Sequence, residues 1–280
     1  MTYQEALRAG EYILDKAGID NPKGDAWILL EQVCHIDRTF YLTHQEEELD
    51  PEEKTQYRIF LTKRIEHVPL QYITGHQCFM GYEFKVNSSV LIPRQDTEVL
   101  VEEVNKLLHE GDKVLDLCTG SGCIITSLKC MNPSIQAVGS DISKAALLLA
   151  KENAKGNGAE VEFVCSDLFE KIHGSFQVIV SNPPYIRSEV IETLDSEVKD
   201  YEPYEALDGK EDGLYFYRLI IEQSKEFLVP GGHLCFEIGY DQGAEISGLL
   251  AEQGYQEIQV KKDLAGLDRV VVARKGKSHV

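Results

Sequence analysis

The sequence lacks the features that mark exported, membrane-spanning or metal-binding proteins. No apolar run approaches the roughly 20 residues of a membrane-spanning helix, and the chain does not open with a basic and then apolar secretory signal. The seven cysteines are odd in number and include no Cys-x-x-Cys pair, and the eight histidines include no His-Glu-x-x-His spacing. We therefore expect no disulfide framework, no metal, no membrane association, and a cytoplasmic compartment in which thiols stay reduced.

Positive charge is also scarce, since 28 basic residues face 47 acidic ones and the formal net charge is −19. Sequence-independent binding of nucleic acids depends on Lys and Arg neutralising phosphates, so we expect no nucleic-acid partner. Such a surface suits a neutral or basic protein partner instead. The length of 280 residues and the apolar content of 43% predict one large domain or two unequal ones.

The first 75 residues are predicted to form a small helical bundle. Thr2 and Glu5 fit a capping box, and the Asx-Pro pairs at 21–22 and 50–51 are typical helix starts. A linker with a β-hairpin is predicted at residues 76–95.

From residue 96 to residue 280, short apolar strands alternate with helices. This pattern predicts a doubly wound α/β domain with parallel strands at its centre. The last two strands have no helix between them, so we expect them to pair antiparallel. Strands are predicted at 113–117, 135–140, 161–165, 176–181, 233–238, 256–260 and 269–273, and helices at 123–131, 143–155, 214–228 and 244–253.

A glycine-rich turn, Asp116-Leu117-Cys118-Thr119-Gly120-Ser121-Gly122, follows the first of these strands. In such sheets, ligands bind beyond the carboxyl ends of the strands. A dinucleotide site is disfavoured because Ile125 stands where the third glycine would be, and no Gly-x-x-x-x-Gly-Lys-Ser/Thr loop occurs. Asp116 would repel a pyrophosphate but suits a cation.

Acidic residues follow the next two strands as well. Asp141 is placed to accept from a ribose diol, and Asp167 to face an adenine amino group. Either aspartate could instead cap a helix. Three aspartates at successive strand ends favour a positively charged nucleoside, and S-adenosyl-L-methionine carries an ammonium and a sulfonium.

Asn182-Pro183-Pro184-Tyr185 follows the apolar segment 176–181, which is typical of a buried strand. The two prolines end that strand and remove two backbone donors. The Asn182 side-chain oxygen and the Pro183 carbonyl can accept both hydrogens of a planar –NH2 group, while Tyr185 packs on its face. Asn-Pro alone is often a simple turn, but the full run predicts a receptor for a planar amine.

With these residues, the chain closely resembles the release factor glutamine methyltransferases, the PrmC/HemK family. The Asn-Pro-Pro-Tyr run is shared with adenine-N6 DNA methyltransferases, so the narrower match depends on the linker and C-terminal segments. The matching segments are 69–75, 90–94, 116–122, 181–186, 202–203, 206–209, 211–214, 237–243 and 263–270.

The resemblance implies a Rossmann-like sheet of seven strands with the last antiparallel, and an N-terminal helical domain that docks the substrate protein. It also implies transfer of a methyl group from S-adenosyl-L-methionine, leaving S-adenosyl-L-homocysteine, to the glutamine in the Gly-Gly-Gln motif of peptide chain release factors. Carried over, 118–122, Asp141 and Leu168 line the cofactor, and 182–185 hold the glutamine, with Asn182 bordering both. We expect a monomer.

Six positions depart from the family pattern. Cys118 and Lys210 stand where glycine is common, and we expect the loop to tolerate Cys118 if its φ is negative. Leu168 replaces a frequent aromatic residue, Tyr204 a frequent arginine, and Gln95-Asp96 the usual Pro-Glu.

Two alternatives stay open. An adenine-N6 nucleic-acid methyltransferase would use the same amine receptor, but a flipped base needs a basic channel, which the net charge of −19 disfavours. A non-catalytic cofactor-binding partner protein would have no use for the Asn182 acceptor.

Overall fold

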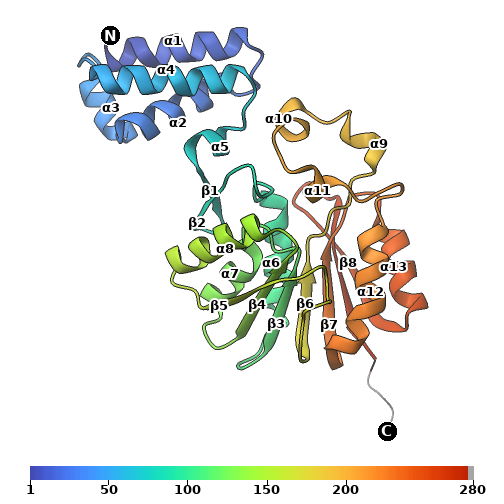
Figure 1. The fold of residues 1–280 in the computed structure, drawn as a ribbon. Coiled ribbons are helices and arrows are strands. Elements are labelled where there is room, and N and C mark those ends of the chain that lie inside the picture. The colour runs from blue at the N-terminus through green and yellow to red at the C-terminus, as the bar shows by residue number, and fades with distance from the viewer. Residues whose placement is uncertain (277–280) are drawn as a thin grey trace. The chain divides into compact units, whose positions relative to one another are not determined.

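The computed structural model describes residues 1–276, so the last four residues of the predicted methyltransferase domain lie outside the described part. The chain forms two compact units, whose elements are labelled in Figure 1. Unit 1 comprises Met1–Gly75 and Asp195–Tyr201, and unit 2 comprises His76–Leu194 and the chain from Glu202 onward. Among the described residues, none of the helices combines the length and the apolar character that crossing a membrane requires.

Unit 1 is helical, as the sequence predicts. Its capping box is confirmed, because Thr2 N donates to Glu5 Oε2 at 3.0 Å and Glu5 N donates to Thr2 Oγ1 at 3.2 Å. Its helices are α1 (Tyr3–Lys16), α2 (Pro22–Cys34), α3 (Arg38–His44), α4 (Pro51–Ile65), α5 (Leu70–Thr74) and α10 (Ser196–Lys199). The sequence patterns miss α3, because this seven-residue helix buries none of its residues and so has no apolar stripe.

A buried arginine ties the later segment into unit 1. Arg64 donates from Nε to Asp25 Oδ2 at 2.7 Å and from Nη2 to Glu197 Oε1 at 2.6 Å. Tyr201 Oη donates to the Glu66 carbonyl at 2.6 Å. Through these bonds the segment Asp195–Tyr201 belongs to the helical unit, although it is more than a hundred positions from α4 in the sequence.

Unit 2 contains a two-stranded hairpin and a seven-stranded sheet. The predicted hairpin is confirmed: β1 (His76–Phe79) pairs antiparallel with β2 (Tyr82–Lys85). The sheet order is β5-β4-β3-β6-β7-β9-β8, and β9 is antiparallel to both of its neighbours, as the sequence predicts for the last strand. The strands are β3 (Lys113–Leu117), β4 (Gln136–Asp141), β5 (Val161–Cys165), β6 (Phe176–Ser181), β7 (Leu228–Glu237), β8 (Tyr255–Lys262) and β9 (Asp268–Lys275).

The helices of unit 2 cover both faces of this sheet (Figure 1). Alternate residues of β3 show why: Leu115 and Leu117 pack in one core, while Val114 packs in the other. The helices of unit 2 are η1 (Gln95–Thr97), α6 (Glu98–Asn105), α7 (Cys123–Met131), α8 (Lys144–Gly156), α9 (Ser188–Ile191), α11 (Tyr204–Leu207), α12 (Tyr215–Phe227) and α13 (Gly243–Glu252). Helices α12 and α13 contribute to the core that contains Leu115, and α6 and α7 to the core that contains Val114.

The long connection between β6 and α12 is only partly predictable. It contains α9 and α11, each four residues long, where the sequence analysis predicts no helix. Such short helices show no apolar periodicity, so they leave no pattern to detect.

Candidate functional site

A cavity of about 580 Å³ opens within unit 2 at the carboxyl ends of its parallel strands. The strand ends are in register: Leu117 pairs with Ser140 on one side and with Ser181 on the other. The turns that follow β3, β4, β5 and β6 therefore meet at one edge of the sheet. Nine of the residues that the sequence singles out line the cavity, namely Cys118, Thr119, Gly120, Ser121, Asp141, Asp167, Leu168, Asn182 and Pro184.

The turn after β3 is held by backbone bonds to its neighbours. Thr119 N donates to the Ser140 carbonyl at 2.9 Å, and Gly122 N donates to the Thr119 carbonyl at 2.8 Å. Gly122 is the N-cap of α7 with a φ of +77°, and a Cβ there would lie 3.0 Å from the Ala150 Cβ. Glycine is therefore required at 122 both by backbone conformation and by close packing against α8.

Asp116 lies below this turn and does not line the cavity. It is fully buried; Oδ2 accepts a hydrogen bond from Thr119 Oγ1, and Oδ1 has no partner of good geometry among the described residues. Burial, together with the negative charge of Asp141, raises the pKa of Asp116 to about 7, although the hydrogen bond from Thr119 lowers it. This carboxyl is poised to ionise when a positive charge comes near.

The condition under which the sequence predicts that the loop tolerates Cys118 is not met, because its φ is +58° and not negative. The loop nevertheless forms, so a left-handed backbone is maintained with a side chain present. Burial and, next, the negative charge of Asp141 raise the pKa of the Cys118 thiol well above its usual range, so the thiol is neutral. Leu168 and Lys210 also have positive φ, of 42° and 70°.

Asp141 is half-buried; it holds the turn after β3 and also lines the cavity. Its Oδ2 accepts from Gly120 N at 2.9 Å and its Oδ1 from Ser143 N at 2.8 Å. Burial raises the pKa of Asp141, while these backbone donors lower it. Each carboxylate oxygen has a second lone pair, so Asp141 can still accept from a diol in the cavity. Asp167 is exposed at the cavity wall after β5.

Asn182 is oriented by a threonine from a distant part of the chain. Its Nδ2 donates to Thr97 Oγ1 at 3.5 Å, and both residues line the cavity. This bond uses the donor end of the carboxamide. The acceptor end, Oδ1, is left for a ligand.

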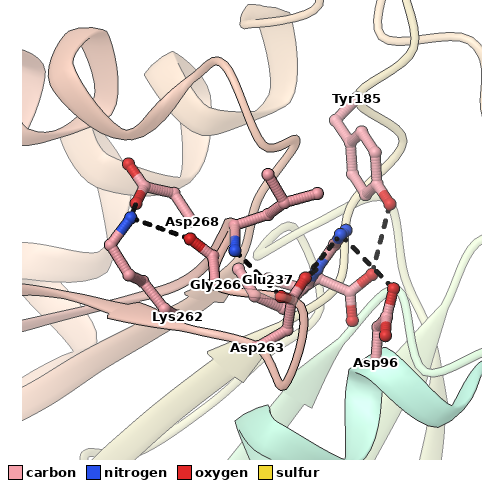
Figure 2. Close-up of polar contacts among 9 residues, drawn as sticks. Asp96, Tyr185, Glu237, Lys262, Asp263, Gly266 and Asp268 are labelled. Carbon is pink, nitrogen blue, oxygen red and sulfur yellow. Dashed lines mark hydrogen bonds and ion pairs between the residues drawn. The ribbon is translucent and has the colours of Figure 1, made fainter.

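Tyr185 turns away from the cavity lining toward the interior. Its Oη donates to Glu237 Oε1 at 3.2 Å, as Figure 2 shows. Burial and the negative charge of Glu237 raise the pKa of Tyr185 above its usual range, so the phenol is protonated. Pro183 is buried and does not line the cavity either.

The backbone of this loop is clamped by the segment before α12. Gly209 N donates to the Ile186 carbonyl at 2.8 Å, and Ile186 N donates to the Leu207 carbonyl at 3.0 Å. Gln242 Nε2 donates to the Tyr185 carbonyl at 3.1 Å. A Cβ on Gly209 would lie 2.7 Å from the Tyr185 backbone, so this approach requires glycine.

Part of the cavity wall was missed by reasoning from sequence alone. The linker segment from Ser89 to Arg94 and the segment from Pro203 to Ala206 both contribute to it, and Arg94 Nη2 forms an ion pair with the buried Glu202. The two partners are 108 positions apart. The family resemblance marks the segments 90–94 and 202–203, but no local sequence pattern predicts that their residues line a binding site. Lys210, Tyr215, Phe216 and Leu219 complete this wall.

Comparisons with known proteins agree with this geometry. Residues 5–75 match the family described as PrmC N-terminal domain, and residues 94–196 match the family described as methyltransferase small domain. A release factor glutamine methyltransferase of Clostridium acetobutylicum is 41% identical over 283 residues, covering 99% of each chain. One of Clostridium botulinum is 42% identical over 282 residues, covering 98% of this chain and 100% of the relative.

A solved methyltransferase structure from Pyrococcus furiosus has the same fold. Its TM-score is 0.54 at 17% identity, covering 79% of this chain and 98% of that chain. The two family matches, the full-length relatives and the shared fold lead to one conclusion. The chain belongs to the release factor glutamine methyltransferase family.

Proposed function

We propose that this protein transfers a methyl group from S-adenosyl-L-methionine to the side-chain amide of the glutamine in the Gly-Gly-Gln motif of peptide chain release factors. The observation that carries the proposal is at Asn182: its Nδ2 donates to Thr97 Oγ1, which leaves Oδ1 to accept from a ligand in the cavity of about 580 Å³ that Asn182 lines. The relatives named for this activity match the chain over almost its entire length.

The residues of the cavity fit the proposed methyl donor. The volume lies within the range of about 300–1,000 Å³ that is usual for small-molecule and cofactor sites. Gly120 has a φ of +55°, and no atom of the described residues lies within 4 Å of where its Cβ would be, so a ligand can approach the backbone there. Asp141 would accept from the ribose, and the unpaired Asp116 oxygen below the turn favours a nearby cation. When bound, the donor supplies a methyl group activated by a positively charged sulfur.

The protein's own contribution is to make an amide nitrogen reactive and to aim it. Delocalisation into the carbonyl makes that nitrogen a poor nucleophile. Acceptance of one of its hydrogens by Asn182 Oδ1, and of the other by the Pro183 carbonyl once the bound amide reaches behind the cavity lining, would favour a pyramidal nitrogen with its lone pair directed at the methyl group. Positioning of this kind can contribute about 7–11 kcal/mol of the barrier reduction. The nitrogen becomes acidic only as it is alkylated, so no strong base is required before the methyl group moves, and the proton that the nitrogen then loses passes to solvent.

The decisive test compares a release factor before and after incubation with the enzyme and the methyl donor. Peptide mass spectrometry should find one added methyl group on the loop glutamine. Asn182→Ala should lose this methylation by at least about 100-fold, while calorimetry shows nearly unchanged binding of S-adenosyl-L-methionine. Asn157→Ala, the same substitution at a residue that does not line the cavity, should keep full activity.

Two outcomes would count against the proposal. Methylation of unmethylated DNA in place of the release factor would favour the adenine-N6 alternative. Loss of cofactor binding together with activity in Asn182→Ala would make Asn182 a cofactor ligand first.

A further inference from the structure

Two of the segments that carry the family resemblance, 237–243 and 263–270, contribute no residue to the cavity lining. Each of them forms a turn that carries large apolar side chains into solvent. Leu264 is fully exposed, Tyr240 is 64% exposed and Leu267 is 45% exposed, and we call these three residues the apolar edge. Single apolar side chains are common on protein surfaces, but a group of them at one place indicates contact with a partner.

The two turns lie next to each other because both flank the start of β9. Ile238 N, at the beginning of the first turn, donates to the Arg269 carbonyl at 2.9 Å. Gly243 follows that turn, and a Cβ on it would lie 2.6 Å from Asp268 Oδ2. Tyr240 lies between these two contacts in the chain. The apolar edge is therefore one local group of side chains and not three scattered ones.

The strand register places the apolar edge at the level of the amine receptor. Strand β7 is parallel to β6, and Phe236 is opposite Ser181. The next residue, Glu237, pairs with Val270 on the antiparallel β9. The start of β9 is therefore level with Asn182, which directly follows Ser181. The turn between β8 and β9 lies beyond that level, at the edge of the sheet where the cavity opens.

An arginine holds the turn between β8 and β9 in place. Arg269 Nη2 donates to Asp263 Oδ2 at 3.1 Å and forms an ion pair with Asp96 Oδ2 at 3.3 Å (Figure 2). Asp263 Oδ1 accepts from Leu267 N at 3.0 Å, so the side chain of Asp263 also closes the turn. Asp96 belongs to η1, the short helix whose threonine accepts from Asn182. These bonds fix the apolar edge relative to the amine receptor.

The charged groups around the apolar edge are already paired with one another. Lys262 Nζ lies 2.9 Å from Asp268 Oδ1, and Arg187 Nη2 lies 3.1 Å from Asp241 Oδ2. Arg269 is held by its two carboxylates. Recognition at this place therefore depends on apolar contact more than on charge, although the whole chain has a net charge of −19. The surface fits a partner that offers apolar side chains.

A protein substrate must contact more of the enzyme than the cavity. The cavity of about 580 Å³ has the size of a small-molecule site. A specific protein–protein interface, by contrast, buries about 800 Å² on each partner. The polypeptide that flanks the methylated glutamine must then lie on the surface around the cavity, and the apolar edge is part of that surface.

We propose that the apolar edge docks the domain of the release factor that carries the Gly-Gly-Gln loop, through apolar side chains next to that loop. The inference rests on the proposed function and adds a surface that presents the glutamine to Asn182. Because the turn is held in one conformation before binding, docking costs little ordering of the enzyme. A few anchoring side chains carry most of the binding energy of an interface, so single substitutions should have measurable effects.

The test measures methylation of the intact release factor by variants of the full-length enzyme. Leu264→Asp and Tyr240→Ala should each raise the KM for the release factor by about tenfold, with kcat and the KM for S-adenosyl-L-methionine unchanged. Leu264→Met keeps an apolar side chain and should stay within about threefold of the wild type. A short Gly-Gly-Gln peptide, which does not extend to the apolar edge, should be methylated equally by all of these enzymes.

Leu148→Asp is the matched control. Leu148 lies on α8, is 66% exposed and does not line the cavity. Leu148→Asp adds the same negative charge as Leu264→Asp, and its KM for the release factor should not rise. The comparison separates apolar contact from electrostatic steering, because an added acidic residue would strengthen steering toward a basic partner.

Direct binding provides a second readout. The Kd of the release factor for the enzyme loaded with S-adenosyl-L-homocysteine, measured by calorimetry, should rise about tenfold in Leu264→Asp. An unchanged KM and an unchanged Kd would overturn the inference. An equal loss of activity on the short peptide would overturn it as well, because the residues would then serve the reactive site and not docking.

Two further outcomes have distinct meanings. Dissociation of a wild-type dimer by Leu264→Asp, seen in sedimentation, would assign the apolar edge to a second copy of the chain and overturn the inference. If the wild type binds the release factor but adds no methyl group, the proposed function fails, and the comparison of Kd values still decides whether the apolar edge is the docking surface.

Discussion

Cys118 and Lys210 adopt the left-handed backbone that glycine adopts most readily, and both stand where the family resemblance predicts glycine. Lys210 is compensated locally: its N–H donates to Asp208 Oδ1 at 3.0 Å and its Nζ to Asp208 Oδ2 at 2.7 Å. These bonds hold a turn that would otherwise be strained. The Cys118 thiol is neutral and offers no comparable ion pair, so its strain is maintained by the packing of the turn.

We predict that Cys118→Gly is more stable to urea than Cys118→Ala by about 1 kcal/mol, because only glycine relieves the left-handed backbone. Comparing the two variants removes the effect of losing the thiol. At Cys130, inside α7, the order should reverse, since glycine in a helix is about 0.5–1 kcal/mol less favourable than alanine. Equal stability of Cys118→Gly and Cys118→Ala would show that the φ of +58° costs nothing.

At the scale of elements, the loop after β6 depends on the segment that contains α11. Ile186 exchanges backbone bonds with this segment, through Leu207 and Gly209, and Gln242 from the start of α13 bonds the Tyr185 carbonyl. The loop conformation is therefore set by contacts with chain that lies more than twenty positions away. Its two prolines end the strand, but they do not fix the path of the loop beyond it.

Gly209→Ala tests this clamp, because the new Cβ would lie 2.7 Å from the Tyr185 backbone and must displace it. We expect methylation to fall by about 100-fold with little change in binding of the methyl donor. Gly248→Ala in α13 is the matched control, since no described atom lies within 4 Å of its Cβ position. That control should gain about 0.5–1 kcal/mol of stability and retain its activity, as measured by urea unfolding and initial rates. Full activity in Gly209→Ala would mean that the loop is not held by this approach.

At the scale of the molecule, the net charge of −19 indicates which kind of partner the protein attracts, and it says little about the fold. A surface of one sign attracts an oppositely charged partner over a distance of about one Debye length, roughly 8 Å at physiological salt. We propose that the release factor presents a basic surface to this enzyme.

This steering should make methylation of the intact release factor sensitive to salt. We expect kcat/KM to fall by about tenfold or more as ionic strength rises, because steering acts on the association rate. A short uncharged peptide with the Gly-Gly-Gln loop serves as the control and should show little salt dependence. A release factor whose kcat/KM is as insensitive as the peptide's would exclude electrostatic steering.

Much of the fold is predictable because its patterns are local. The strands from residue 113 to residue 181 are largely continuous apolar runs, and the antiparallel final strand follows from the missing helix between the last two strands. The prediction was less accurate for β7, which begins at Leu228 and not at residue 233, since its glycine pair at 231–232 interrupts the apolar run. Short helices such as α3 and α9 left no period to detect.

By itself, the sequence determined the type of site: a strand-ending Asn-Pro-Pro-Tyr run, aspartates and a glycine turn at strand ends, and an acidic surface. These are properties of residues close together in the chain, and parallel strands bring their ends to one edge by rule. Only the tertiary structure decided the direction of the Asn182 carboxamide, that is, which of its two ends is left to bind a ligand. That direction depends on Thr97, which is 85 positions away in the sequence and meets Asn182 only in the folded chain. Hydrogen-bond polarity is a property of groups in contact, and sequence order does not reveal which groups will meet.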